Sequence, residues 1–183
     1  MSGYAASPST SVSSSPGSNA PPVGLAGLLR MISRVRGVIN ASSSSARKEN
    51  SFSSRRGIGI AVAPDDRLIY VIDSHPEVGA NRKIWAFELD ESGEPTSQRL
   101  IYDFAPGRGG DGMELDVEGN LYVCAGIRTP RGPGETSLFS PGVYVITPAG
   151  ELSSHIPIPQ DVITNCCFGG GDMRTLFVTA GHT

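Results

Sequence analysis

The chain has 183 residues, with 18 acidic residues against 15 lysines and arginines, so its formal net charge at pH 7 is −3. A mildly acidic chain excludes a chain-wide basic surface for nucleic acid. No stretch approaches the roughly 20 apolar residues that a transmembrane helix needs. Three cysteines are too few, and odd in number, for a disulfide framework, so we expect a reducing compartment, by default the cytoplasm.

The segment 1–56 differs in composition from the remainder. It holds seven basic residues, one acid and 16 serines, a charge of +6, whereas residues 57–183 hold eight basic and 17 acidic residues, a charge of −9. Such a segment buries too little apolar surface to offset the entropy of ordering, which predicts a disordered extension. Between residues 24 and 39, apolar residues recur at helical spacing and indicate a short amphipathic helix. A leader of this composition is typical of a mitochondrial or plastid transit peptide, with a plain low-complexity extension as the alternative.

From residue 57 onward the sequence repeats one pattern of short strands. A run of small and apolar residues, an acidic or glycine-rich turn and an aromatic-centred strand occur three times, with Tyr70, Tyr122 and Phe177 at the corresponding aromatic positions. A unit of about 50 residues with four short strands is typical of a β-propeller blade. The two further strands that complete each of the first two units are expected at 83–90 and 98–104, and at 142–147 and 151–158.

The number of repeats limits how much of a propeller the chain can form. The segment 57–183 suffices for two blades and the first two strands of a third. Propellers close with about four to eight blades, so the sequence predicts an all-β fold of about two and a half blades, part of a propeller. Open sheet edges favour pairing with another chain, so a partner that completes the propeller through an edge strand is one alternative, and a truncated gene product is another. The second unit is longer, and its extra Gly, Pro and Arg residues at 127–141 predict a loop.

Three segments of the repeat carry a family resemblance. They read GIAVAPDDRLIYVIDS at 59–74, DGMELDVEGNLYV at 111–123 and TNCCFGGGD at 164–172. In this order they resemble the gluconolactonase, senescence marker protein and luciferin-regenerating enzyme family of six-bladed propellers, over about residues 57–183. The resemblance implies a lactonase, a hydrolase of a sugar lactone or similar ester, whose partner is a small-molecule lactone. It also implies a divalent cation, calcium, zinc or manganese, held by one Glu, one Asn and one Asp.

Carried over to this chain, the resemblance places the catalytic, metal-binding aspartate at Asp111. The asparagine position falls on Ile58, which has no side-chain oxygen, and the glutamate belongs to a blade that this sequence lacks. A cation would polarise the lactone carbonyl and acidify a bound water, but a single carboxylate holds a hard cation weakly. We therefore expect an impaired or inactive lactonase, with a non-catalytic binding or scaffold module as the alternative. Without the resemblance, Asp111 followed by glycine also fits an ordinary turn.

Two other groups of residues invite a chemical interpretation. Ser74 and His75 are adjacent on a predicted strand and point to opposite faces, so we expect no nucleophile–base contact between them. Cys166 and Cys167 lack the gap of two to four residues usual for a metal-binding pair, so we expect both to be buried structural thiols.

Overall fold

The computed structural model describes residues 57–181, which form ten β-strands and no helix. None of these residues therefore belongs to a helix that could span a membrane. The predicted extension over 1–56, including the helix expected at 24–39, lies outside the described residues.

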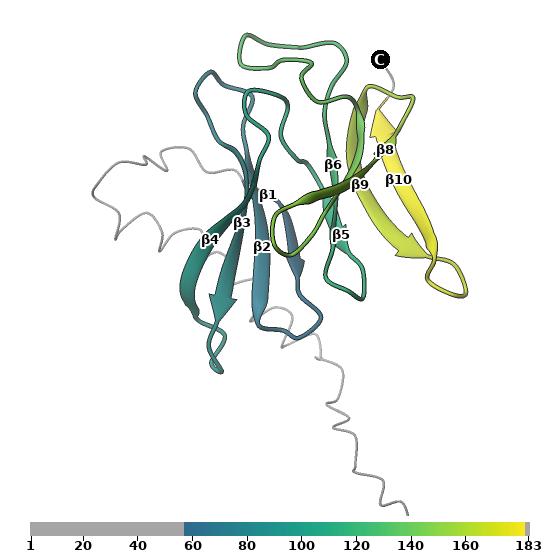
Figure 1. Cartoon of the computed structure of the whole chain (residues 1–183). Helices are drawn as coiled ribbons and strands as arrows, with labels where there is room; N and C mark the ends of the chain where they lie inside the picture. Colours follow the sequence, from purple (N-terminus) through teal and green to yellow (C-terminus); the bar gives the residue numbers. More distant parts are fainter. Residues whose placement is uncertain (1–56, 182–183) are drawn as a thin grey trace, which may run out of the picture.

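The strands form two four-stranded antiparallel sheets and one antiparallel pair (Figure 1). In each sheet, strands that follow one another in sequence are hydrogen-bonded neighbours, the order expected of a propeller blade. The structure thus confirms the predicted all-β, partial propeller. The first sheet contains β1 (Gly57–Val62), β2 (Leu68–Ser74), β3 (Arg82–Leu89) and β4 (Pro95–Asp103); the second contains β5 (Met113–Leu115), β6 (Leu121–Ala125), β7 (Gly142–Ile146) and β8 (Leu152–Pro157); the third contains β9 (Val162–Gly169) and β10 (Thr175–Gly181).

The hairpin between the first two strands of every sheet is closed by an aspartate. In each case the carboxylate accepts the backbone N–H of the residue two positions later, which stabilises the turn locally. The acidic turn of the sequence repeat therefore has a direct structural role. The three pairs are Asp65 with Arg67 at 3.0 Å, Asp116 with Glu118 at 2.9 Å, and Asp172 with Arg174 at 3.1 Å.

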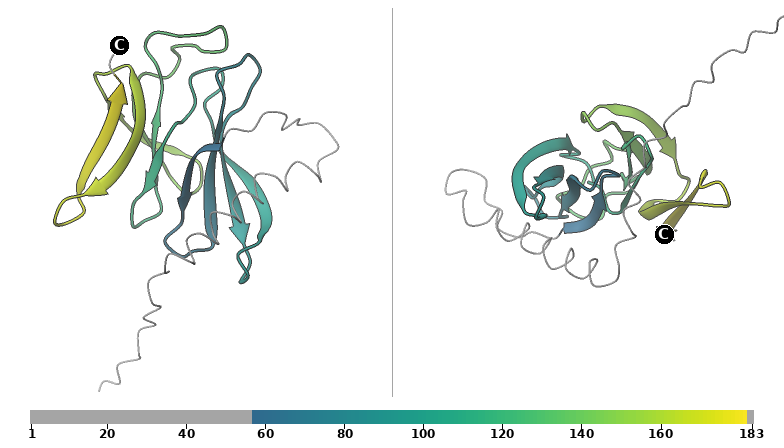
Figure 2. Two further views of the ribbon diagram at one scale, coloured as in Figure 1. Left: turned by 180° about the vertical axis from the view of Figure 1, so that it is seen from behind. Right: turned by 90° about the horizontal axis from the view of Figure 1, so that it is seen from below.

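The three sheets lie side by side in chain order (Figure 2), with the first strand of each sheet next to the first strand of its neighbour. The main core fills the space between the first two sheets. A smaller apolar cluster joins the second sheet to the β9–β10 pair. The main core includes Tyr70, Ile72 and Ile84 from the first sheet and Leu121, Val123, Tyr144 and Ile146 from the second; the smaller cluster includes Cys124, Val143, Ile163 and Cys166.

The vicinal cysteines separate across the two faces of β9. Cys166 is buried, and its Sγ donates to the carbonyl of Tyr122 at 3.2 Å, whereas Cys167 is exposed. The prediction of two buried thiols is therefore wrong for Cys167. The reason is that adjacent residues of a strand point to opposite faces, and only one face of β9 packs on the second sheet.

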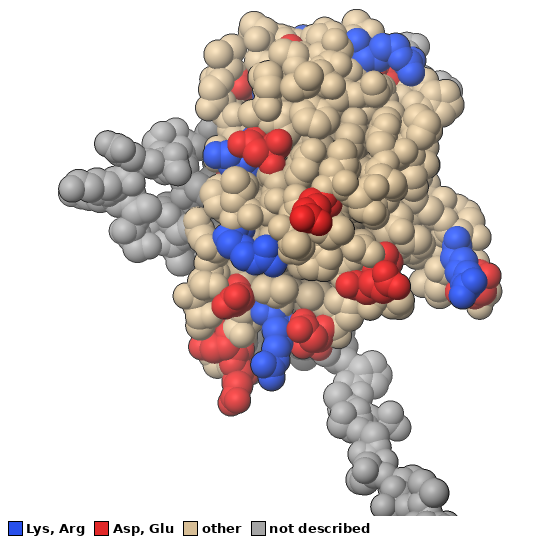
Figure 3. Space-filling model, viewed as in Figure 1, with Lys and Arg blue, Asp and Glu red and all other residues tan. Residues whose placement is uncertain are grey.

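Charged side chains are distributed over the surface without a large basic patch on the face shown in Figure 3, where lysine and arginine lie scattered among acidic residues.

Candidate functional site

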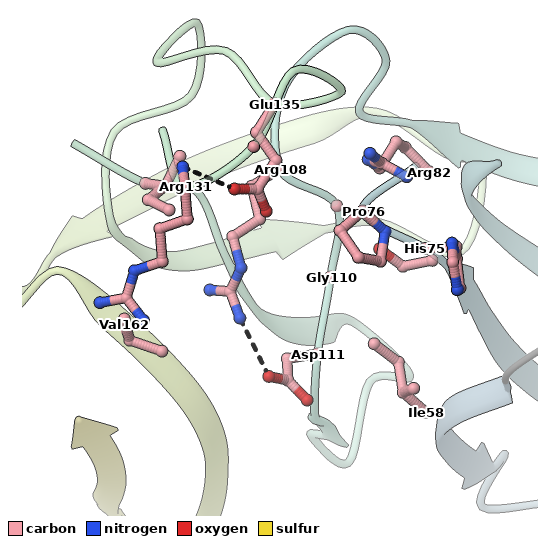
Figure 4. Close-up of a pocket in the computed structure, with 14 residues that line it drawn as sticks. Ile58, His75, Pro76, Arg82, Arg108, Gly110, Asp111, Arg131, Glu135 and Val162 are labelled. Atoms are coloured by element: carbon pink, nitrogen blue, oxygen red, sulfur yellow. Dashed lines mark hydrogen bonds and ion pairs between the residues drawn. The ribbon is translucent and has the colours of Figure 1, made fainter. Parts of the chain in front are cut away.

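A pocket of about 480 Å³ opens at one end of the sheets (Figure 4). The start of β1, the end of β2 and the start of β3 form one side of it. The segment before β5, the loop between β6 and β7 and the start of β9 form the other side. Five charged residues line it, namely Arg82, Arg108, Asp111, Arg131 and Glu135, together with apolar residues that include Ile58, Ile127 and Val162.

Asp111 reaches the pocket because its backbone is fixed between two sheets. Its N–H donates to the carbonyl of Cys124 on β6 at 2.8 Å, and the next N–H, of Gly112, donates to Thr164 on β9 at 2.8 Å. On the other side β1 approaches closely, since a Cβ on Gly59 would lie 2.5 Å from the carbonyl oxygen of Asp111. Asp111 therefore lies where all three sheets meet.

The carboxylate of Asp111 is paired with a guanidinium group. Nη2 of Arg108 lies 3.1 Å from Oδ2 of Asp111, and the side chains are 17% and 30% exposed, respectively. Burial raises the pKa of Asp111, while the positive charge of Arg108 and its hydrogen bond oppose that rise. Arg108 also points its Nη1 at the carbonyl of Ile163, at 3.4 Å. The aspartate that the sequence singled out thus occupies a partly buried ion pair.

The described residues around Asp111 do not fit a divalent metal ion. Ile58 lines the same pocket and presents only carbon (Figure 4). Within residues 57–181 no cluster of three His, Cys, Asp or Glu side chains is close enough to hold a cation. Hard cations bind six or more oxygens, and the carboxylate of Asp111 already neutralises Arg108.

The loop over residues 127–141, predicted from composition, contains no strand and covers part of the pocket. Arg82, only 3% exposed, donates from Nη2 to the carbonyl of Gly134 at 2.9 Å and so ties the loop to β3. Burial lowers the pKa of Arg82, and the charge of Glu135 opposes this. At the other end of the loop, the buried carboxylate of Asp161 accepts the backbone N–H groups of Arg128 and Thr129.

Arg131 projects from this loop into the pocket. Its backbone N–H donates to Oε2 of Glu135 at 3.0 Å, which closes a tight turn. In Figure 4 the guanidinium groups of Arg131 and Arg108 both point toward the part of the pocket lined by Val162 and Asp111.

Ser74 and His75 also line the pocket. Nδ1 of His75 accepts the N–H of Glu77 at 3.3 Å, and no hydrogen bond joins His75 to Ser74 in the part of the chain that the structure describes. Strand β2 ends at Ser74, so the alternation of strand faces expected for the two residues does not apply to His75, and both side chains face the same pocket.

Sequence reasoning identified Asp111 and Ile58 but not the arginine residues around them. Arg82, Arg108 and Arg131 come from a strand, a glycine-rich segment and an irregular loop, with no common spacing. The enrichment of arginine in the loop at 127–141 was the one available signal.

The chain is similar in sequence to a known family of proteins. The model of the SMP-30/Gluconolactonase/LRE-like region matches residues 38–182. A gluconolactonase from Zymomonas mobilis is 36% identical over 132 residues, which cover 68% of this chain and 32% of that protein. A 6-deoxy-6-sulfogluconolactonase from Pseudomonas putida is 31% identical over 126 residues, covering 68% and 38%. The chain thus spans about a third of the length of the curated relatives it matches.

Solved structures show the same fold. A gluconolactonase from Xanthomonas campestris superposes with a TM-score of 0.53 at 28% identity, covering 69% of this chain and 35% of that one. A calcium-binding protein, regucalcin, from Agrobacterium tumefaciens superposes with a TM-score of 0.52 at 22% identity, covering 68% and 38%. The relatives with this fold thus include both lactonases and a calcium-binding protein.

Proposed function

The chain belongs to the SMP-30/gluconolactonase/LRE-like family, a family of lactonases, and we propose that its pocket binds a sugar lactone or a similar cyclic ester. The observation that carries this proposal is the location of Asp111. The residue that the family resemblance selects lies in the pocket, fixed by backbone hydrogen bonds to β6 and β9. The names of two relatives, a gluconolactonase and a 6-deoxy-6-sulfogluconolactonase, support a lactone of sugar origin as the substrate class.

We further propose that lactonase turnover is impaired in this chain. Among the described residues, Asp111 is the candidate catalytic carboxylate and the candidate ligand for calcium, zinc or manganese. The guanidinium of Arg108 already neutralises its charge. Ile58, at the position where the resemblance implies an asparagine, has no oxygen in its side chain. Both features weaken the binding of a cation at Asp111, since hard cations require several oxygen ligands.

A restoration experiment tests this assignment. The full chain and its Ile58→Asn variant are titrated with calcium, zinc and manganese while thermal unfolding is followed, and hydrolysis of glucono-δ-lactone is measured with a pH indicator. We expect Ile58→Asn to strengthen metal binding and raise the rate, and Asp111→Ala to abolish both gains. A cation at about 100 times its Kd adds about 2.7 kcal/mol to the free energy of unfolding.

Ile60→Asn is the matched control, because Ile60 lies two positions further along β1, is similarly exposed and does not line the pocket. Equal effects of the two asparagine variants would contradict the role assigned to Ile58. Rapid metal-dependent turnover by the unaltered chain, lost in Asp111→Ala, would show that the proposed impairment is wrong.

A second candidate function, a binding or scaffold module, is favoured by the edge of the third sheet. Within the described residues β10 pairs with β9 alone, and Phe177 on it is 54% exposed. Such an edge can accept a strand from another chain. Light scattering of the full chain tests this: a concentration-dependent dimer supports edge pairing, and a monomer at all concentrations contradicts self-association through this edge.

A further inference from the structure

The pocket has a positive charge that its own acidic residues do not cancel. Three arginines and two acids line it, a formal charge of +1 with His75 neutral. Residues 57–183 as a whole carry −9, from eight basic and 17 acidic residues, so three of the eight basic side chains gather at this one place. A local concentration of positive charge on an acidic body attracts anionic ligands to that site.

The three guanidinium groups differ in how many of their N–H donors already bond to protein atoms. Arg82 is buried and donates to backbone carbonyls, so its role is to hold the loop. Arg108 uses Nη2 on Asp111, and its Nη1 contacts are long, at 3.4 and 3.5 Å. The guanidinium of Arg131 has no hydrogen bond or ion pair to any described residue. Two arginines thus retain donors for a ligand.

We propose that Arg131 and Arg108 bind an oxyanion group of the ligand, a carboxylate, sulfonate or phosphate on a sugar lactone or sugar acid. A guanidinium matches such groups because its planar fork donates two parallel hydrogen bonds. The apolar surfaces of Ile58, Ile127 and Val162 are available for the carbon skeleton. The inference deepens the proposed function and rests on it for the sugar part of the ligand, while the anion site rests on the arginines alone.

The anion has two chemical sources. It is either a charged substituent that the lactone carries, or the carboxylate that forms when the ring opens. Both would draw on Arg108, whose present partner is Asp111, so the ligand competes with that aspartate. Removing the charge of Asp111 is therefore expected to strengthen anion binding.

Isothermal titration calorimetry of the full chain, with a chelator present so that metal plays no part, tests the proposal. The probes are glucose 6-phosphate, which carries only a substituent anion, gluconate, which carries only the carboxylate, and neutral glucose. We expect at least one anionic probe to bind and glucose to bind at least about tenfold more weakly, since a charge-assisted hydrogen bond contributes enough for such a factor. Which anion binds identifies the source.

Variants locate the binding. Arg131→Gln is expected to weaken the binding of the anionic probe about tenfold or more, and Asp111→Asn is expected to strengthen it. Arg128→Gln is the matched control, because Arg128 lies in the same loop and carries the same charge, but contacts the carbonyl of Pro159 and does not line the pocket.

Equal losses in Arg131→Gln and Arg128→Gln, or equal binding of glucose and both anions, would overturn the proposal. So would the absence of binding by both anions. Anion binding together with no lactone hydrolysis by Ile58→Asn would overturn the lactonase assignment under Proposed function but leave the anion site standing, so the two failures are distinguishable.

Discussion

Asp161 is the residue whose removal most directly tests how the pocket loop is held. It is 6% exposed, and its carboxylate accepts two backbone N–H groups at the start of the loop, from Arg128 and Thr129. Asp161→Ala leaves both donors without their partner. An unsatisfied buried donor costs about 1–3 kcal/mol, and a surface loop recovers part of this by hydration. We therefore expect a loss of about 2 kcal/mol in the free energy of unfolding, and a melting temperature about 8 °C lower.

Urea denaturation measures this loss, followed by the fluorescence of Trp85, the single tryptophan of the chain, and by circular dichroism. Asp172→Ala is the matched control, because Asp172 accepts one N–H in an exposed turn. We expect Asp161→Ala also to speed tryptic cleavage at the arginines of the loop. Unfolding midpoints for Asp161→Ala and Asp172→Ala that agree within error would refute the reasoning.

The pH dependence gives a second check on the same residue. Burial alone would raise the pKa of Asp161, but the N–H groups of Arg128 and Thr129 hold it below its ordinary value. A carboxyl group whose pKa is lowered on folding contributes stability above its unfolded pKa of about 3.9 and loses it as the pH falls through the folded pKa. The stability difference between wild type and Asp161→Ala is therefore expected to be constant from pH 7 to 5 and to shrink only below about pH 4.

Three further predictions concern single side chains. Burial, opposed by the neighbouring guanidinium, raises the pKa of Asp111. Asp111→Asn is therefore expected to be at least as stable as wild type at pH 7, and the difference in stability is expected to close as the pH falls through that pKa. Thermal melts from pH 7 to 4 measure this, and a lower melting temperature of the variant at pH 7 would contradict it. Tyr144→Phe loses a hydrogen bond of 2.6 Å to a loop carbonyl, and urea unfolding is expected to show a loss of about 1 kcal/mol; no loss would mean that water replaces the bond fully. Gly59→Ala places a Cβ 2.5 Å from the backbone oxygen of Asp111, so its melting temperature is expected to fall well below that of Gly171→Ala, where a Cβ meets open space.

The fold was predictable because its signal repeats. Each hairpin of the repeat carries an aspartate in its turn and an aromatic residue in its second strand, such as Tyr70 and Tyr122, and recurrence at about 50 residues distinguishes blades from isolated hairpins. The predicted strands overlap all ten observed strands. Their ends differ by a few residues, as at β5, which is limited to Met113–Leu115 between the backbone bonds that fix Asp111 and the turn at Asp116.

The pocket was only partly predictable. Asp111 was found because a family motif marks it, and the same motif exposed Ile58 as a departure. Arg131 lies well beyond that motif, in a segment where apolar residues show no regular spacing. It faces the pocket because the buried side chains of Arg82 and Asp161 hold the loop in place. Side chains that meet through such anchors leave no regular spacing in a sequence.

The loop between β6 and β7 also has a consequence for how this protein can diversify. The groups that anchor it are backbone carbonyls and N–H groups, so its exposed side chains can be exchanged without disturbing strand pairing. Phe139, which packs against the core between the sheets, and Gly134, which has no room for a Cβ, are the exceptions. Substitutions or length changes there re-shape part of the pocket wall while Asp111 keeps its position, which β6 and β9 fix independently of the loop. We therefore expect substitutions between residues 129 and 138 to alter the pocket wall with little effect on fold stability, and this segment is the natural place for random mutagenesis aimed at new ligands.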